Sequence, residues 1–391
     1  VEDSFVDWRL RLCFVGDDND EVETVHTAQA EQLADYIAAE HPNMNVDKIY
    51  LDAYEQETST GGQRCPTANT AISNAVNQGM FLVNYTGHGG ELGWAHERIL
   101  GIEDINTWNN ENNLPLFMTA TCEFGRYDDP ERVSAAEHIF LKEKSGAIAL
   151  LTTSRVVFTD NNLDLNEAFL ENLFPNSNEA TFPRLGDILM RTKNNVNDIE
   201  DLNHRNFTLL GDPALTLAYP VYDVVLTEVV DSAKALGQVT LKGEVQRNGE
   251  KLETFEGFVF PTVFDKRTDF QTLGQDESPV LVFDLQKNKL FNGKSTVSQG
   301  EFSFTFIVPK DINYDFGNGK ISLYAKGTVN EEQLDASGFS NEIIIGGTAE
   351  GFSNDNLGPE ISLFINDTNF IRGGITNADP NLYALLYDEN G

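Results

Sequence analysis

Short apolar runs alternate with helical hydrophobic patterns over residues 1–218. The segment 23–42, for example, places Ala30, Leu33 and Ile37 on one helical face and ends at Pro42. The predicted strands are the runs 11–17, 48–54, 80–89, 114–122 and 147–154, and the predicted helices are 23–42, 67–79, 134–146, 163–175 and 184–196. Strands that are apolar on both faces and alternate with helices predict a parallel sheet covered by helices on both sides.

From Tyr219 the pattern changes to an alternation of apolar and polar residues with a period of two. Seven such runs, separated by turn residues, lie at 222–230, 237–246, 257–266, 278–286, 301–309, 319–327 and 340–347. They predict that 219–347 is an antiparallel β-sandwich of immunoglobulin type. A Gly- and Asn-rich linker and a new β-like run from Glu360 predict that 348–391 holds a linker and the start of a further β domain.

Two predicted strands end in small residues around a side chain that is suited to chemistry. The run "FLVNYTGHGG" contains His88, and the run "LPLFMTATCEFG" contains Cys122. Consecutive strands are often neighbours, and reactive residues collect at the carboxyl ends of parallel strands. We therefore expect His88 and Cys122 to lie together at one edge of the sheet. A histidine beside a cysteine promotes the thiolate that attacks a carbonyl carbon.

Other groups at this edge suit the remaining roles in thiol acyl transfer. The N–H groups of Gly89 and Cys122 would stabilise the negative charge that develops on the carbonyl oxygen, if both turns are tight. A third side chain usually orients the histidine. The first strand ends in "GDDND", so Asp17 or Asp18 would stand at the same edge.

Three residues near the two turns are candidates for substrate binding. Trp94 follows the glycine turn and either lines the cleft or packs within its own loop. Glu123 and Arg126 belong to the segment 123–132, which directly follows the cysteine and carries both charge signs. This segment either docks an incoming acceptor or is a solvated loop before the next helix.

The composition excludes several classes of protein. The formal net charge is −35, with 62 acidic and 27 basic residues, so a phosphate backbone would be repelled and nucleic acid is not an expected partner. The sequence has no apolar run long enough for a transmembrane helix. Three cysteines form no disulfide framework. Cys13 is predicted to be a buried apolar residue and Cys65 an incidental loop residue, which leaves Cys122 for chemistry.

This chemistry requires no cofactor, and no spacing of the CxxC or HxxxH type predicts a metal at the site. Calcium remains an open question, because Asp- and Asn-rich loops suit divalent cations. The segment 311–320 carries Asp and Asn at alternate positions, as calcium loops do. Its glycine comes one position late, and Ser322 stands where a bidentate Glu is needed, so we predict a β-turn instead.

Several motifs of the chain resemble the gingipain family of cysteine peptidases. They are "NYTGHGG", "ATCEFG" and "LLGDPALTL", in the same order as in that family. The stretches "SGAIALLTTSRVVF", "CEFGRYDDP" and "VPKDINYDFGNGKISLYA" are similar to one branch of the family, the sortases of the type IX secretion system. The resemblance covers the whole chain.

The resemblance implies a caspase-like α/β fold with His88 as the catalytic histidine and Cys122 as the nucleophile. Asp18 matches the acidic member of the family's site when "LCFVGDD" is aligned, although gingipains have Glu there. Gingipains that cut after arginine have an acidic pocket residue near the position of His26. In the family another half-domain precedes this one, so we expect a further part before Val1.

The same resemblance implies a function. The chain would be a cysteine endopeptidase or transpeptidase that removes C-terminal sorting domains from proteins secreted by the type IX system. Its partners would be those substrates and other outer-membrane secretion components, and it would act at the cell surface or after secretion. The alternatives are a gingipain-like protease of broader specificity and a non-catalytic binding module on the same fold.

Overall fold

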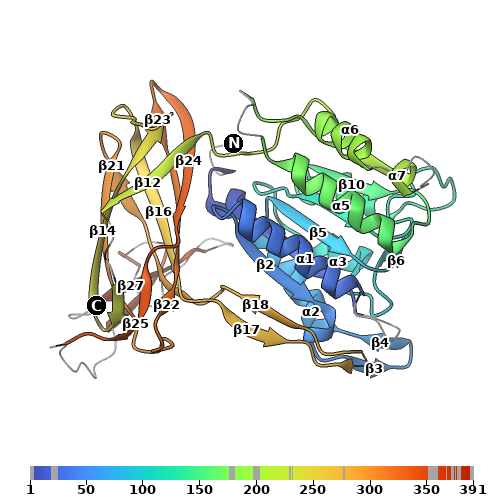
Figure 1. Ribbon diagram of the computed structural model, residues 1–391, viewed down its shortest axis with the longest axis horizontal. Coiled ribbons are helices and arrows are strands. Elements are labelled where there is room, and N and C mark those ends of the chain that lie inside the picture. Colours follow the sequence, from blue (N-terminus) through green and yellow to red (C-terminus); the bar gives the residue numbers. More distant parts are fainter. Residues whose placement is uncertain are drawn as a thin grey trace.

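The computed structural model describes residues 4–18, 25–175, 181–196, 203–228, 230, 232–275, 278–350, 360–366, 368–370, 374, 376 and 380–387. An α/β domain lies beside a β-sandwich, and a long hairpin from the sandwich reaches along the α/β domain (Figure 1). The predicted fold class, a caspase-like sheet with flanking helices followed by a β-sandwich, is confirmed.

A six-stranded sheet forms the centre of the α/β domain. Its strands are β1 (Arg11–Gly16), β2 (Asn45–Tyr50), β5 (Leu82–Thr86), β9 (Leu116–Ala120), β10 (Ala149–Thr153) and β11 (Phe207–Leu210), in the order β11-β10-β9-β5-β1-β2. All neighbouring pairs are parallel except β10 with β11. The carboxyl ends of β1, β5, β9 and β10 therefore meet at one edge of the sheet.

Helices cover both faces of this sheet. One face carries α1 (Val25–Glu40), α5 (Thr159–Leu173) and α6 (Leu185–Asn195), and the other carries α2 (Pro66–Gln78), α3 (Ile102–Thr107) and α4 (Ala135–Phe140). Successive side chains of a strand point to opposite faces. In β1, Leu12 and Phe14 accordingly join one core, while Cys13 and Val15 join the other.

Short elements connect the strands and helices. They are the 3-10 helices η2 (Asp7–Leu10) and η3 (Leu51–Ala53), helix α7 (Asn203–Asn206), the hairpin β3 (Glu57–Ser59) with β4 (Gly62–Arg64), and the small sheet of β6 (Gly89–Gly90), β7 (Gly93–Trp94) and β8 (Leu100–Gly101). The small sheet begins directly after His88, at the edge where the carboxyl ends of the strands meet.

The sandwich is built from one large and one small sheet. The large sheet contains β12 (Tyr222–Glu228), β14 (Gln238–Arg247), β15 (Glu250–Lys251), β16 (Glu256–Phe264), β19 (Lys289–Asn292), β20 (Ser295–Val297), β21 (Glu301–Ile307), β23 (Lys320–Val329) and β24 (Glu332–Ser340), and the small one contains β13 (Ser232–Ala235), β22 (Gly317–Asn318) and β25 (Ile344–Thr348). Alternate residues of these strands, such as Leu241, Val259 and Leu323, form a hydrophobic core that is separate from the cores of the α/β domain.

Several strands from Tyr222 onward differ from the sequence-based expectation, and β18 and β24 are two of them. The run 278–286 was expected in the sandwich, but β18 (Val282–Leu285) pairs with β17 (Thr268–Gln271) in a hairpin that leaves the sandwich. Its Phe283 is buried against Tyr50 of the α/β domain, so the buried face of the run lies on another domain. Strand β24 was not predicted, because its sequence lacks a clear alternation, yet it pairs with β23 along its whole length.

Buried polar contacts join the two domains. Arg9 Nη1 binds Asp335 Oδ2 at 2.8 Å, and the Tyr324 hydroxyl donates to the same oxygen at 2.9 Å. Burial raises the pKa of Asp335, although Arg9 acts in the opposite direction. Lys320 Nζ donates to the Met44 carbonyl at 2.5 Å. Removing one member of a buried pair leaves an uncompensated charge, so these contacts hold the domains in one arrangement.

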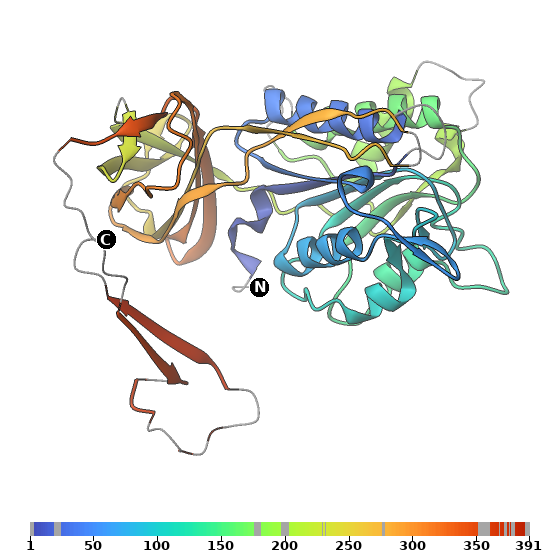
Figure 2. The same ribbon diagram turned by 90° about the horizontal axis from the view of Figure 1, so that it is seen from below.

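The C-terminal described strands, β26 (Glu360–Ile365) and β27 (Leu382–Tyr387), pair with each other and with no other strand of the described residues (Figure 2). Among the helices that the structure describes, none has both the length and the apolar character needed to span a bilayer.

Candidate active site

His88 and Cys122 follow neighbouring strands at matching positions. Strands β5 and β9 pair in parallel with Thr86 opposite Ala120, and His88 and Cys122 each come two residues later. The Gly87 N–H donates to the Ala120 carbonyl at 3.3 Å, so the two chains stay adjacent beyond the strands. Both side chains are half-buried. The structure thus brings the two predicted residues together at the same edge of the sheet.

Glycines allow the turn around His88 to approach its neighbours closely. A Cβ atom on Gly89 would stand 2.7 Å from Thr121 Oγ1, on the residue before the cysteine. A Cβ atom on Gly87 would stand 2.4 Å from Asp17 Cβ. At Gly90, in contrast, a Cβ atom would meet nothing within 4 Å. The two turns are therefore in direct contact at Gly89, and Gly87 lets the turn of His88 approach Asp17.

The three cysteines differ in how their thiols are exposed. Cys13 and Cys65 are each 1% exposed, whereas Cys122 is half-buried. Burial raises the pKa of the Cys13 thiol and of the Cys65 thiol, so neither forms a thiolate readily. Cys122 is the one cysteine that a substrate at this edge of the sheet can reach.

The backbone around Cys122 adopts a tight and unusual turn. Glu123 has a φ of 52°, in the left-handed region that residues other than glycine seldom occupy. Its N–H donates to the Arg155 carbonyl at 3.3 Å, and the Cys122 thiol faces the Val157 carbonyl at 3.6 Å. No hydrogen bond between described residues uses the Cys122 N–H, so this donor is available to a ligand.

The backbone of His88 is fixed on both sides. Its N–H donates to Asp17 Oδ2 at 2.9 Å, and its carbonyl accepts from the Tyr85 hydroxyl at 2.6 Å and from the Ala95 N–H at 2.9 Å. Burial and the nearby Asp17 raise the pKa of Tyr85 well above its ordinary value, so the phenol remains a neutral donor. Tyr85 was missed in the sequence, where it reads only as a strand residue.

The ring of His88 lies between two other imidazoles. His26 meets it edge-on, with centroids 4.7 Å apart and planes at 80°, and His96 stacks on it at 5.4 Å and 14°. His26 is buried, at the start of α1.

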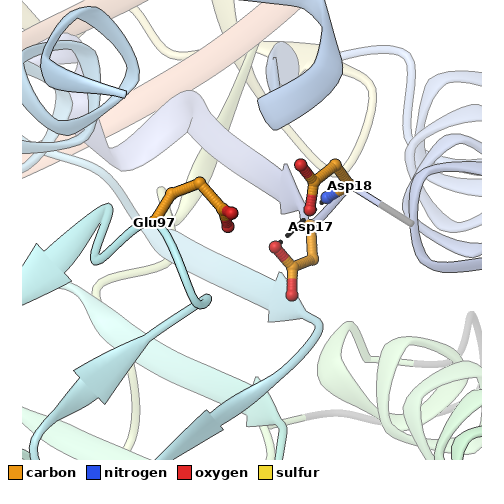
Figure 3. Close-up of side chains that lie close together, drawn as sticks. All are labelled: Asp17, Asp18 and Glu97. Carbon is orange, nitrogen blue, oxygen red and sulfur yellow. Dashed lines mark hydrogen bonds between the residues drawn. The ribbon is translucent and has the colours of Figure 1, made fainter. Parts of the chain in front are cut away.

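Three buried carboxylates gather beside this histidine. Oxygen atoms of Asp17, Asp18 and Glu97 lie within 4.8 Å of one another (Figure 3). Asp17 Oδ1 accepts the Asp18 N–H at 3.1 Å, while Gln56 Nε2 donates to Asp18 Oδ2. The contact with the His88 backbone comes from Asp17, whose other oxygen accepts the backbone N–H of Asp18, the predicted third residue. Oxygen ligands of this kind suit a hard divalent cation such as Ca²⁺.

Trp94 does not line a cleft, contrary to the expectation that it binds substrate. It is 0% exposed and stacks on Tyr85, with centroids 4.2 Å apart and planes at 7°. A residue in this position packs the small sheet β6–β8 onto the α/β core. Trp94 therefore packs inward, onto the aromatic residues of the α/β core.

Glu91, which the sequence did not single out, ties the two turns together. Its Oε1 binds Arg126 Nη1 at 2.9 Å and its Oε2 binds Arg132 Nη1 at 2.9 Å. Arg126 also lies 3.5 Å from Glu123 Oε1. Arg126 is thus paired with two carboxylates of the loops, one of which is Glu123. Substrate binding by Glu123 or Arg126 remains a prediction.

The segment 311–320 bends and leads through strand β22 into strand β23. Asn313 Oδ1 accepts the Asp315 N–H at 3.0 Å, and Lys266 Nζ donates to the Asn313 carbonyl at 2.8 Å. The side-chain oxygen of Asn313 therefore stabilises its own loop, and its carbonyl is bound by the Lys266 ammonium.

A thiol and an imidazole at matching strand ends of a caspase-like sheet are the minimal equipment of a cysteine peptidase. The model of peptidase family C25 matches residues 2–218, which is more than half of the chain. The chain belongs to this family, the gingipain family, and is a cysteine peptidase. No curated protein matches the sequence.

Solved structures of this family are similar to the chain. The complex of Porphyromonas gingivalis RgpB pro- and mature domains has 16% identity and a TM-score of 0.44, covering 87% of this chain and 69% of that one. The Arg-specific cysteine proteinase gingipain R (RGPB) has 17% identity and a TM-score of 0.45, with coverage of 87% and 68%. Dimeric latent PorU from Porphyromonas gingivalis has 30% identity and a TM-score of 0.36, with coverage of 55% of this chain and 21% of that one. This chain thus spans about a fifth of the PorU chain.

Proposed function

We propose that this cysteine peptidase is a sortase of the type IX secretion system, in which Cys122 is the nucleophile and His88 the general base and acid. Its substrates would be secreted proteins with C-terminal sorting domains, which it would cleave at the cell surface. The roles of Cys122 and His88 are supported by their positions, each two places beyond the paired Thr86 and Ala120. The choice of a sortase is supported by stretches similar to that branch of the family, such as "CEFGRYDDP".

In the first step, His88 accepts the thiol proton and the Cys122 sulfur attacks the scissile carbonyl carbon. The tetrahedral intermediate carries its negative charge on the former carbonyl oxygen. The unused Cys122 N–H is one donor for this oxyanion, and the Gly89 N–H on the adjacent turn is the second. Collapse of the intermediate breaks the C–N bond, and His88 returns the proton to the departing amine, which leaves a thioester on Cys122.

Asp17 acts on His88 through the backbone. Three hydrogen bonds, from Asp17, Tyr85 and Ala95, fix the backbone of His88. Contacts with the rings of His26 and His96 restrict the position of its imidazole. A fixed imidazole reduces the reorganisation needed at each proton transfer. The role that the resemblance assigned to Asp18 is therefore proposed to be shared, with Asp17 as the direct contact.

The second step decides between hydrolysis and transfer. Water attacks the thioester in a peptidase, whereas an amine attacks it in a sortase, and the amine must be bound in place to compete with solvent. The segment 123–132 is proposed to be the docking surface for that amine. It directly follows Cys122, and Arg126 and Asp128 hold it to Glu91 and Arg155.

The test uses a protein substrate with a C-terminal sorting domain and an added amine, with both products quantified. Wild type should give the hydrolysed and the transferred product, and Cys122→Ala should give neither. Combined replacement of Arg126, Asp128 and Asp129 by Ala, Asn and Asn should lower transfer more than hydrolysis. Glu131→Gln, a neutralisation in the same segment, is the matched control.

Equal losses of the two products would show that the segment supports the cleavage step or the fold instead of the acceptor. Cleavage of unrelated proteins at a comparable rate would favour the gingipain-like protease of broader specificity. A wild-type protein that cleaves nothing, and whose Cys122 reacts no faster with iodoacetamide than Cys13 and Cys65, would leave the binding module as the function.

A further inference from the structure

The hairpin β17–β18 connects the sandwich with the part of the α/β domain that lies beside the candidate active site. It runs from the sandwich along the α/β domain toward β3 and β4 (Figure 1). Its body is held on β2. The Phe283 ring lies 4.9 Å from the Tyr50 ring, and Asp284 Oδ1 lies 3.2 Å from Lys48 Nζ. These contacts dock the strands of the hairpin on the α/β domain.

The tip of the hairpin is held by one buried aspartate. The Leu273 N–H donates to the Asp52 carbonyl at 2.7 Å. The N–H groups of Gly274 and Gln275 donate to the two carboxylate oxygens of Asp52 at 3.0 and 2.9 Å. Asp52 is 2% exposed, so these donors replace the water that its charge has lost. These three donors are backbone groups and remain when the side chain at 275 is changed, whereas a fourth contact, from Gln275 Nε2 to Asp52 Oδ1 at 3.3 Å, is lost.

The side chain of Gln275 reaches further, onto the segment before β3. Its Nε2 donates to the Tyr54 carbonyl at 2.8 Å, and its Oε1 accepts the Gln56 N–H at 2.9 Å. One amide therefore pairs with a carbonyl and an N–H of the same short segment, much as a neighbouring strand would. The two backbone partners also fix which end of the amide is oxygen and which is nitrogen.

From Gln56 the hydrogen bonds continue to the catalytic histidine. The Gln56 side-chain amide donates to Asp18 Oδ2. The Asp18 N–H donates to Asp17 Oδ1, and Asp17 Oδ2 accepts the His88 N–H. An unbroken series of contacts thus links the sandwich hairpin to the backbone of His88.

We propose that Gln275 and Gln56 are positioning residues of the active site, through which the β-sandwich sets the place of Asp18 and Asp17 and hence of His88. This inference rests on the proposed function of His88 and Cys122. The sandwich is then part of the catalytic apparatus and acts on His88 through Gln56, Asp18 and Asp17.

A hairpin that served only to fasten the two domains would behave differently. Such a clamp depends on Phe283, Asp284 and the backbone donors to Asp52, and the amide of Gln275 would add to it only the 3.3 Å contact with Asp52 Oδ1. Positioning depends on that amide, because without it the segment that presents Gln56 gains freedom, and the Gln56 side chain loses its fixed approach to Asp18. The two roles are separable by changing Gln275 alone.

The experiment compares Gln275→Met and Gln56→Met with Gln271→Met. Methionine keeps the length of glutamine and removes its hydrogen bonds. Gln271 lies on the same hairpin with an exposed side chain, so it is the matched control. The measurements are the rate of alkylation of Cys122 by iodoacetamide, kcat and KM for the sorting-domain substrate, and the melting temperature.

The expected result is a loss of about 10-fold in kcat for Gln275→Met and for Gln56→Met, with little change in KM, because small displacements of a catalytic group are costly. Alkylation of Cys122 should slow in parallel. Gln271→Met should match wild type. Because both changes interrupt the same series of contacts, the double variant should lose little more than either single variant.

Unchanged kcat and alkylation in both variants, with an active wild type, would overturn the inference and leave the proposed function intact. An inert wild type would overturn the proposed function itself. If Gln275→Met lowers the melting temperature strongly, Gln56→Met decides, because it leaves the hairpin and all its contacts with Asp52 unaltered.

Discussion

Asp17 binds the backbone of His88 and lies at the end of a different strand. Its Oδ2 accepts the His88 N–H at 2.9 Å across a separation of 71 residues in the sequence. The carboxylate is 1% exposed, and its other oxygen is held by the Asp18 N–H. The place of the proposed general base is thus set by strand β1, which carries neither of the two reacting side chains.

Replacement of His88 tests its role as general base. His88→Ala should lower hydrolysis of a peptide substrate by about 10²- to 10⁴-fold, the usual contribution of a positioned acid–base group. Alkylation of Cys122 should slow as well, because no neighbouring base accepts the thiol proton. His138→Ala, in helix α4, is the control and should leave both rates unchanged. Equal alkylation rates in His88→Ala and wild type would exclude a functional pair.

Replacement of Asp17 separates its geometry from its charge. Asp17→Ala should lower kcat by about 10²-fold, because the His88 N–H loses its acceptor and the ring shifts. Asp17→Asn should lose less, because the amide oxygen still accepts that N–H. The measurement is kcat for both variants at the same pH. A loss in Asp17→Asn as large as that in Asp17→Ala would show that the negative charge is what matters.

The contact between the two turns predicts a contrast between adjacent glycines. Gly89→Ala would bring a methyl group to 2.7 Å from Thr121 Oγ1 and to 2.9 Å from the Gly93 carbonyl. It should destabilise the protein by about 1–3 kcal/mol and lower activity. Gly90→Ala meets nothing within 4 Å and should change the free energy of unfolding by no more than about 0.5 kcal/mol. Chemical denaturation of both variants gives the comparison, and similar losses would contradict the close approach.

Lys320 predicts a pH dependence of stability at the domain interface. Burial, aided by Arg267, lowers the pKa of Lys320 to about 7 from 10.5. Between these values the unfolded chain binds the proton more tightly, so the contribution of this group to stability rises with pH over that range. Lys320→Met removes the cost of the buried charge, and it should therefore improve stability relative to wild type more at pH 6 than at pH 10.

Denaturation curves of wild type and Lys320→Met at both pH values give the measurement. Lys310→Met, a change at an exposed lysine of the same domain, is the control for general charge effects. A difference between Lys320→Met and wild type that is the same at pH 6 and pH 10 would show that Lys320 keeps an ordinary pKa in the folded protein.

The parallel sheet, and the placement of His88 and Cys122 at the same edge of it, could be predicted from the sequence. Both follow from the spacing of apolar residues along the chain. Apolar strands alternating with helices give a parallel sheet, and its strand ends share one edge. The run 278–286 shows the limit of this reasoning. Its alternation is correct, but a period of two says only that one face is buried and not which domain covers it.

The surroundings of the site depend on contacts between segments that are distant in the sequence. Asp17 and Asp18 are adjacent carboxylates that sequence alone could not rank, because their roles depend on where each side chain points beyond the strand. Glu91 and Glu97 lie in loops without a recognisable motif. Trp94 was ambiguous, because an aromatic residue after a turn packs inward or lines a cleft with equal ease.

The hairpin also sets an order of events during synthesis. The ribosome delivers the whole α/β domain before residues 266–286 exist, and domains generally fold as they emerge. During that interval Asp52 has no hairpin to hold, and Gln56 has no partner from the sandwich. If the sandwich positions His88 as proposed, a newly made α/β domain carries its cysteine and histidine but works at full rate only once the sandwich has folded against it. Incomplete chains would therefore have little peptidase activity.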